Sequence, residues 1–194
     1  MLKKILIHFK NQRGFTLVEM LVTALIFSII IGTTVGVFVS VIRIQRYNLT
    51  YHQLLAQTSY AIEYMARAIR MAKKESPALG CLSSDTLNYE RKDIPTTSIP
   101  GLMFRNYKGV CKGFFLQDGQ LKEYEKGRTD PILPLTSANF DLISLGFEVT
   151  GESDSDTLQP RVTVFMEIRG EGSAFQPGPR IRIQTTISQR NLDI

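Results

Sequence analysis

One apolar run near the N-terminus constrains this chain more than any other feature. From Phe15 to Ile42 the sequence reads FTLVEMLVTALIFSIIIGTTVGVFVSVI, and Glu19 is its only charged residue. A helix of this length, at about 1.5 Å per residue, spans roughly 42 Å, which exceeds the hydrocarbon core of about 30 Å. A secretory signal peptide has an apolar core of about 7 to 15 residues and a small-x-small cleavage site, and the run has neither. We therefore expect a membrane-spanning helix over residues 15–42.

The start of this run resembles a known processing signal. Residues 13–19 read RGFTLVE, with a short basic segment before them, a glycine at position 14 and an aromatic residue at position 15. This pattern resembles the type III signal of type IV pilins and pseudopilins. The resemblance implies a leader peptide of residues 1–14, cleavage between Gly14 and Phe15 by a prepilin peptidase, and N-methylation of Phe15. It also implies that the mature chain joins a filament with other pilin or pseudopilin subunits.

A helix that only anchors the chain in a membrane would not need the charge of Glu19. A carboxylate within a spanning helix costs roughly 2.5 to 3.5 kcal/mol on insertion scales and usually has a partner. Cleavage would create a cationic amine at Phe15, and Glu19 of one subunit could then pair with the Phe15 amine of the next. The alternative is that Glu19 lies near enough to the membrane edge to reach water.

Length and charge limit what the rest of the chain can be. With 194 residues, 43% apolar and 21% charged, the chain has room for one anchor and one domain of ordinary size. The formal net charge of +5 would suit a nucleic-acid-binding surface. However, four basic residues lie in the leader without any acid: Lys3, Lys4, Lys10 and Arg13. Most of the net positive charge therefore belongs to the leader and not to the rest of the chain. We therefore expect no direct nucleic-acid partner.

The same basic residues predict the topology. The leader carries four of them, whereas Arg43 and Arg46 follow the apolar run, and positive residues favour the cytoplasmic side. We expect a single-pass protein of the cytoplasmic membrane with its N-terminus inside and its C-terminal domain exported, within a filament after assembly.

Gly32 and Gly36 lie within the apolar run, four residues apart. A small-xxx-small pattern lets neighbouring helices approach closely, so we predict a helix-packing role for both. Each glycine also costs about 0.8 to 1.0 kcal/mol of helix propensity relative to alanine, which would allow local melting. The alternative is that neither glycine has a specific role, because glycine is common in membrane helices.

Residues 43–76 have helical periodicity and predict an amphipathic continuation of the helix. The apolar stripe comprises Ile44, Tyr47, Tyr51, Leu54 or Leu55, Thr58, Ile62, Met65, Ile69 and Ala72. Ser76 should end the helix, because the residue before a proline disfavours helical angles. The segment Met65–Ala72 resembles the helix end of J-type pseudopilins of type II secretion and of W-type minor pilins.

After Pro77 the pattern changes to alternation and turn residues. Strands are predicted over residues 86–89, 101–107, 111–116, 120–124, 140–150, 161–169 and 180–188. Asp118-Gly119 predicts a hairpin with a type I′ turn. We therefore expect an α+β fold, in which a long N-terminal helix packs on an antiparallel β-sheet as in pilins. Residues 77–194 would form the exported β-rich domain, and the ending Ile183–Asn191 resembles the last strand of many minor pilins.

Residues suited to catalysis are few. His8 lies in the leader and His52 on the predicted helix, so a His-based triad or a His-rich metal site has little to draw on. Residues 152–156 (ESDSD) gather three carboxylates but lack the glycine and distant glutamate of a calcium loop. We expect no enzyme activity, cofactor, metal or small-molecule substrate.

The only two cysteines, Cys81 and Cys111, both fall in the domain predicted to be exported. An even number of cysteines in an oxidising compartment favours a disulfide. This bond would tie the exit of the long helix to the sheet. The alternative is two buried free thiols that act as small apolar side chains.

Three functions are compatible with these features. The favoured one is a minor pilin or pseudopilin, a structural subunit of a type IV pilus or a type II secretion-like filament. The second is a single-pass, membrane-tethered binding module that does not polymerise. The third, a tethered exported enzyme, is disfavoured by the missing catalytic residues.

Overall fold

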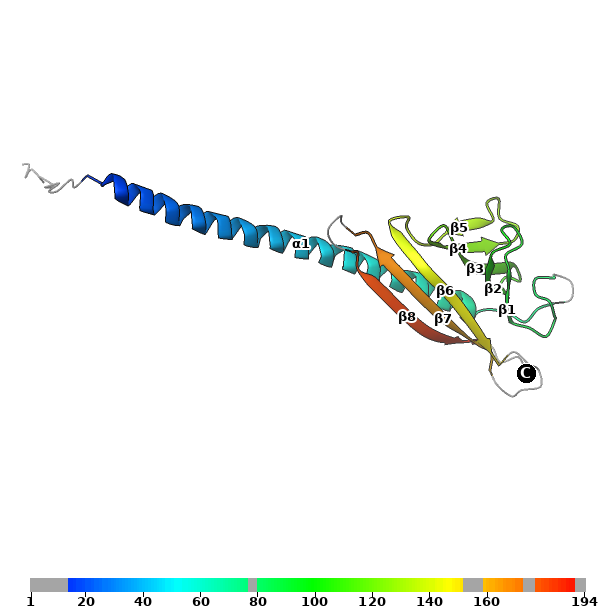
Figure 1. The fold of residues 1–194 in the computed structure, drawn as a ribbon. Coiled ribbons are helices and arrows are strands. Elements are labelled where there is room, and N and C mark those ends of the chain that lie inside the picture. Colours follow the sequence, from blue (N-terminus) through cyan, green and yellow to red (C-terminus); the bar gives the residue numbers. More distant parts are fainter. Residues whose placement is uncertain (1–13, 77–79, 152–158, 173–176, 191–194) are drawn as a thin grey trace, which may run out of the picture. The chain divides into compact units, whose positions relative to one another are not determined.

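A computed structural model describes residues 14–76, 80–151, 159–172 and 177–190. By its internal contacts the chain divides into two units, residues 1–46 and 47–194. The helix α1 runs over Leu17–Arg70, and every later helix or strand among the described residues is a strand (Figure 1). Its residues up to Arg46 belong to the first unit, and its remaining residues belong to the second.

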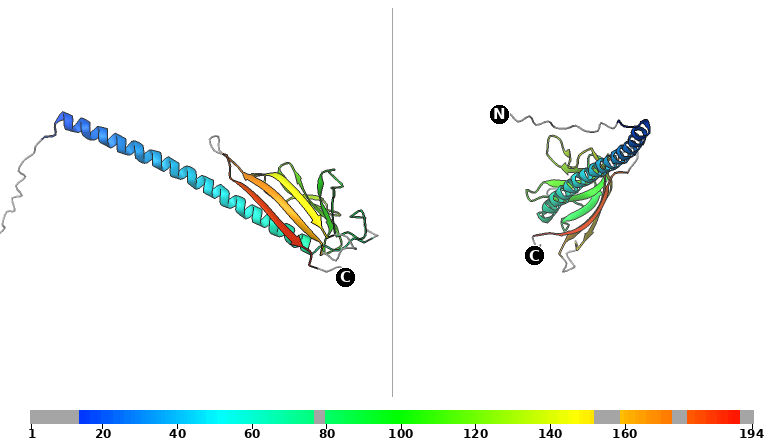
Figure 2. Two further views of the ribbon diagram at one scale, coloured as in Figure 1. Left: turned by 60° about the horizontal axis from the view of Figure 1, so that its bottom comes forward. Right: turned by 90° about the vertical axis from the view of Figure 1, so that its left-hand side faces the viewer.

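The strands of the second unit form two antiparallel sheets. The first sheet has the order β1-β2-β3-β4-β5 and the second has the order β6-β7-β8. The strands are β1 (Tyr89–Asp93), β2 (Pro100–Arg105), β3 (Cys111–Gln117), β4 (Gln120–Glu125), β5 (Ile132–Pro134), β6 (Phe140–Thr150), β7 (Arg161–Gly170) and β8 (Arg180–Ser188). The predicted α+β pilin-like fold is confirmed, but two sheets replace the single one expected. Figure 2 shows β6, β7 and β8 side by side.

The hairpin between β3 and β4 has the predicted turn. Asp118 and Gly119 have φ angles of 54° and 70°, and Gln117 pairs with Gln120. Positive φ at both central residues defines the type I′ turn, which aspartate tolerates and glycine favours. The Asp118-Gly119 prediction is therefore confirmed.

Two strands differ from their predictions. The first strand was expected at residues 86–89 but lies at Tyr89–Asp93, where the sequence YERKD has no apolar alternation. The short strand β5 (Ile132–Pro134) was missed. It is flanked by Pro131 and ends in Pro134, and proline inside a run argues against a strand unless it lies at a sheet edge.

The core lies between α1 and the strands. Alternate residues of β7 are buried as expected, namely Val162, Val164, Met166 and Ile168. On α1 the buried residues are Leu54, Thr58, Ala61, Met65, Ala66 and Ile69. The predicted stripe is therefore covered only from Leu54 onward, because Ile44, Tyr47 and Tyr51 are exposed.

The helix ends at Arg70, earlier than the expected end at Ser76. The Lys73 backbone N–H donates to the Arg105 carbonyl at 2.9 Å, so the chain already pairs with the last residue of β2. The Arg190 backbone N–H donates to the Arg70 carbonyl at 3.0 Å, which satisfies one of the free carbonyls at the helix end. These tertiary bonds end the helix before Pro77 could do so.

Candidate functional site

The predicted cleavage bond lies just before α1. Residues 14–16 are not helical, and the Phe15 side chain is 74% exposed. Thr16 caps the helix, because its Oγ1 accepts the Glu19 backbone N–H at 3.2 Å. The Gly14–Phe15 bond therefore lies outside the hydrogen-bonded helix.

Glu19 lies in the first turn of α1. The backbone N–H groups of a first helical turn carry partial positive charge, which stabilises a carboxylate there. Thr16 and Glu19 also have the spacing of a capping box. The T-x-x-E spacing of these two residues is the sequence signal for this cap, and a capping role for Thr16 was not predicted above.

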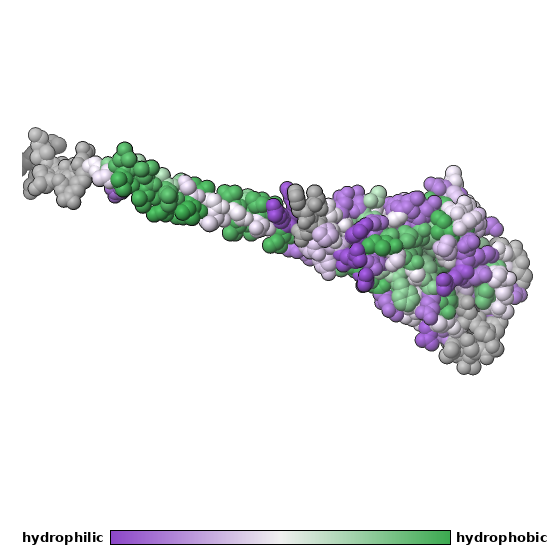
Figure 3. All heavy atoms as spheres, in the orientation of Figure 1, coloured by the Kyte–Doolittle hydropathy of each residue, from purple (hydrophilic) through white to green (hydrophobic). Residues whose placement is uncertain are grey.

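The first unit presents an apolar surface. Every residue from Gly14 to Val41 is exposed, and the space-filling view shows a largely apolar surface along this stretch (Figure 3). An 18-residue window of α1 reaches a mean hydropathy of 2.5, and the helix is long and apolar enough to cross a membrane. Soluble proteins rarely expose so large an apolar surface, which suggests membrane anchoring.

The hydroxyl groups within this surface bond to their own helix. Five of them donate to a carbonyl three or four residues earlier: Thr23 to Met20, Ser28 to Ala24, Thr33 and Thr34 to Ile30, and Ser40 to Gly36. Unsatisfied polar groups are costly in hydrocarbon. These bonds therefore suit the helix to an apolar environment.

Gly32 and Gly36 meet nothing in the described chain. A Cβ atom built on either would find no heavy atom within 4 Å, apart from the local helix backbone. Contacts within the described chain therefore do not require glycine at these positions. A packing role would have to involve another helix, and it stays a prediction.

Cys81 and Cys111 lie side by side in the second unit. Their Cα atoms are 5.5 Å apart, within the range of about 4.4 to 6.8 Å that a disulfide requires. Both belong to a small apolar cluster with Ile94, Met103 and Phe115. The geometry is compatible with the predicted bond.

A buried charged cluster, not foreseen from the sequence, ties α1 to the first sheet. The Tyr64 hydroxyl donates to Glu123 Oε2 at 2.5 Å, and Lys112 Nζ lies 3.1 Å from the same oxygen. Arg128 contacts Glu123 Oε1 at 2.9 Å and Glu125 Oε2 at 2.7 Å. The fully buried Glu123 carboxylate is therefore bonded through both oxygens, as a buried charge requires.

The same cluster shifts two pKa values. Burial, followed by the hydrogen bond to Glu123, raises the pKa of Tyr64. Burial alone would lower the pKa of Lys112, but its bond to Tyr64 and the charge of Glu123 outweigh this effect, and the pKa is raised. Tyr64 is thus held neutral and Lys112 charged.

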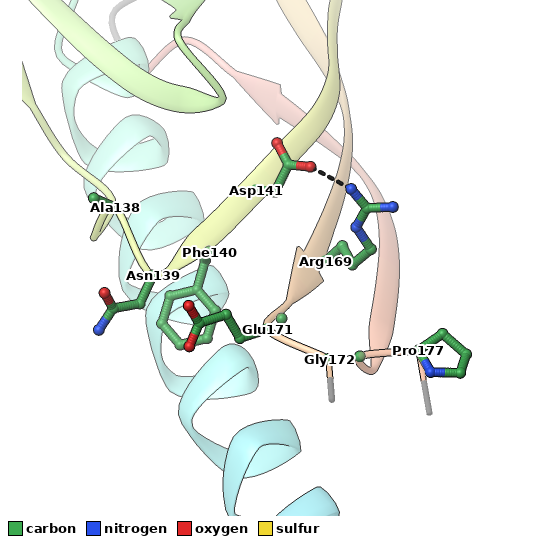
Figure 4. Close-up of a pocket in the computed structure, with 10 residues that line it drawn as sticks. Ala138, Asn139, Phe140, Asp141, Arg169, Glu171, Gly172 and Pro177 are labelled. Atoms are coloured by element: carbon green, nitrogen blue, oxygen red, sulfur yellow. Dashed lines mark hydrogen bonds and ion pairs between the residues drawn. The ribbon is translucent and has the colours of Figure 1, made fainter. Parts of the chain in front are cut away.

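A cleft at the end of the second sheet offers little for catalysis (Figure 4). It has a volume of about 380 Å³ and is lined by residues 138–141, 169–172 and 177–178. Its Asp141 carboxylate is paired with Arg169 at 2.6 Å. Among the described residues, no group of three histidine, cysteine or acidic side chains could hold a metal ion.

Of the remaining sequence candidates, the structure describes only His52. His52 is exposed on α1 and lies edge-on to Tyr51, with ring centroids 6.3 Å apart. His8 and the acidic segment 152–156 lie outside the described residues.

Comparison with known proteins gives one match. Residues 9–35 match the family model described as the prokaryotic N-terminal methylation motif. The matched region includes the Gly14–Phe15 bond, Glu19 and Gly32, and it supports a type IV pilin-like relationship and processing by a prepilin peptidase. No curated protein and no solved structure matches the chain significantly.

Proposed function

We propose that this chain is a minor pilin or pseudopilin, a structural subunit that is cut between Gly14 and Phe15 and assembled through its N-terminal helix. The observation that carries the proposal is the methylation-motif match over residues 9–35, together with the exposed apolar helix that follows the cleavage bond. Proteins with this motif are structural, and we propose no catalytic role.

We propose a domain organisation on the same basis. Residues 1–14 would be the leader, 15–42 the membrane-spanning and filament-core segment, 43–76 its continuation, and 77–194 the exported domain. The chain would rest in the cytoplasmic membrane before it enters a filament. Within the family we favour the J-type pseudopilins and W-type minor pilins, which the helix end and the last strand resemble.

The proposed assembly contact joins Glu19 of one subunit to the methylated Phe15 amine of another. Two features support it. Glu19 lies in the first helical turn, about one turn from the new terminus. In an apolar environment a carboxylate needs a partner of opposite charge, and processing supplies one. Gly32 and Gly36 would let neighbouring helices pack closely further along.

The domain would be stabilised by a disulfide between Cys81 and Cys111. Their Cα separation of 5.5 Å and the oxidising compartment predicted for the domain support this bond. It would close a loop between the end of α1 and β3.

The test is to replace Glu19 by alanine and to measure how much of the subunit co-purifies with other pilins from sheared filaments. We expect membrane insertion to persist and co-purification to be lost. Glu63→Ala is a matched control, because Glu63 lies on the same helix and is exposed. Unchanged co-purification of the Glu19 variant would show that the proposed contact with the Phe15 amine is wrong. Absence of the parent chain from sheared filaments would instead favour a tethered module that does not polymerise.

A further inference from the structure

The free edge of β8 is longer than the outer strands β1 and β5 of the first sheet. β8 (Arg180–Ser188) contains nine residues, and β7 pairs with it on one side only. Among the described residues, no backbone group bonds to its other side. By contrast, β5 has three residues and ends in Pro134, and the Leu142 N–H of β6 bonds to the Gly119 carbonyl at 2.7 Å.

Natural proteins protect a long sheet edge with proline, bulges, charged side chains or inward-pointing charges. Between Arg180 and Ser188 the strand β8 has no proline, bulge or inward-pointing charge, and its two charged residues, Arg180 and Arg182, are paired with Glu167 of β7. Its inward positions are Ile181, Ile183, Thr185 and Ile187, which are buried or half-buried. Its pairing with β7 is regular throughout. The edge is therefore suited to accept a further strand.

A groove runs beside this edge. It has a volume of about 370 Å³ and is lined by Ile183, Thr185 and Ile187 of β8 and by residues of α1 between Ser59 and Arg70. Its apolar floor includes Ile62 and Ala66. The apolar side chains of an added strand would face this floor.

The rim of the groove is basic. Arg67 and Arg70 line it, and Arg190 is joined to Arg70 by a backbone hydrogen bond of 3.0 Å. Glu63 also lines the groove, but it is paired with Arg67, so Arg70 gives the lining its excess positive charge. No described acidic group pairs with the side chain of Arg70 or Arg190.

We propose that this edge is a binding site for an extended acidic segment of another protein, which adds a strand to β8. Strand addition provides backbone hydrogen bonds, and alternate side chains provide specificity. Apolar residues of the segment would face Ile62 and Ala66, and its acidic residues would meet Arg70 and Arg190. A second copy of β8 fits poorly, because antiparallel pairing would bring Arg190 of one copy toward Arg180 and Arg182 of the other. The proposal goes beyond filament assembly, since it needs neither cleavage nor Glu19.

The test uses the full chain in neutral detergent and a fluorescent peptide that alternates valine with glutamate and matches the nine residues of β8. We expect saturable binding that slows amide hydrogen exchange within β8. The double variant Arg70→Glu/Arg190→Glu should weaken binding about tenfold and prefer a valine–lysine peptide.

The matched control is Arg91→Glu/Lys92→Glu, which makes the same charge change on β1, an exposed edge of the other sheet. This control should bind like the parent chain. Equal weakening by both double variants would overturn the proposal, as would binding without protection in β8. Protection that appears without peptide as the protein concentration rises would identify a second copy as the occupant and would also overturn it.

Discussion

The two units of this chain use apolar residues in opposite ways. In the first unit, Leu25 and Phe27 are exposed, as are all the other residues between Gly14 and Val41. In the second unit, side chains of the same types are buried, such as Leu54 and Phe104. The first unit therefore depends on an apolar environment outside the chain, whereas the second supplies its own core.

The two units also differ in how their polar groups are hydrogen-bonded. In the first unit the hydroxyls of Thr23, Ser28 and Ser40 bond to carbonyls within one helical turn. The second unit contains local polar contacts as well, but it also has contacts between residues far apart in the sequence, such as Tyr64 with Glu123. The polar groups in the first-unit part of α1 can thus be hydrogen-bonded without tertiary structure, whereas the buried charged cluster of the second unit cannot.

The largest effect is expected from a matched pair of phenylalanine substitutions. Phe104→Ala should destabilise the domain by about 3 to 5 kcal/mol, because it leaves a cavity in the core. Phe27→Ala should leave the stability of the domain unchanged, since Phe27 is 64% exposed. Denaturant unfolding of the full chain in detergent, followed by near-ultraviolet circular dichroism, measures both. Similar losses would show that the two regions do not differ as described.

Loss of the proposed disulfide is expected to come next. The double variant Cys81→Ser/Cys111→Ser should lose roughly 3 to 4 kcal/mol, the chain-entropy value for a loop of about 30 residues. The same unfolding measurement applies, with the parent chain under reducing conditions as the control. Two thiols that can be alkylated in protein from the native compartment would show that the bond does not form.

A somewhat smaller loss is expected from the buried charged cluster. Glu123→Gln leaves Lys112 and Arg128 without their main partner, and breaking a buried pair costs about 3 to 5 kcal/mol. We expect the lower end of this range, because Glu125 still contacts both cations. Glu63→Gln on the exposed face of α1 should cost about 0.5 kcal/mol or less. Equal costs would show that the cluster is no stronger than a surface ion pair.

The smallest effect concerns pH. The pKa values of Tyr64 and Lys112 are both raised in the folded domain. The stabilisation they provide is therefore complete below their unfolded values of about 10 and 10.4 and is lost as the pH rises through the folded values. The stability difference between the parent chain and Tyr64→Phe should shrink above about pH 10. A constant difference up to high pH would contradict this coupling, and Tyr60→Phe is the control.

The sequence predicted the features that depend on local pattern. The β7 face from Val162 to Ile168 and the Asp118-Gly119 turn follow from alternation and turn chemistry, and both are confirmed. The helix end at Arg70 depends on Lys73 bonding to Arg105, a contact that no local pattern encodes. The cluster around Glu123 was missed for the same reason.

The candidate site could be predicted in part from the sequence. The helix that contains Glu19 is present, and the motif match includes the predicted cleavage bond. The roles of Gly14, Phe15, Glu19, Gly32 and Gly36 stay predictions, because each concerns an enzyme or a second subunit. The free edge of β8 could not be predicted, since sequence does not show which strand lies at the edge of a sheet.

We propose that the exposed apolar helix is the processed assembly segment of a filament subunit. Intact-mass measurement of the protein extracted from membranes of cells with an active prepilin peptidase tests this proposal. We expect a mature chain that begins at methylated Phe15, and we expect Gly14→Leu to accumulate as the uncleaved precursor. A parent chain that still carries residues 1–14 would contradict it.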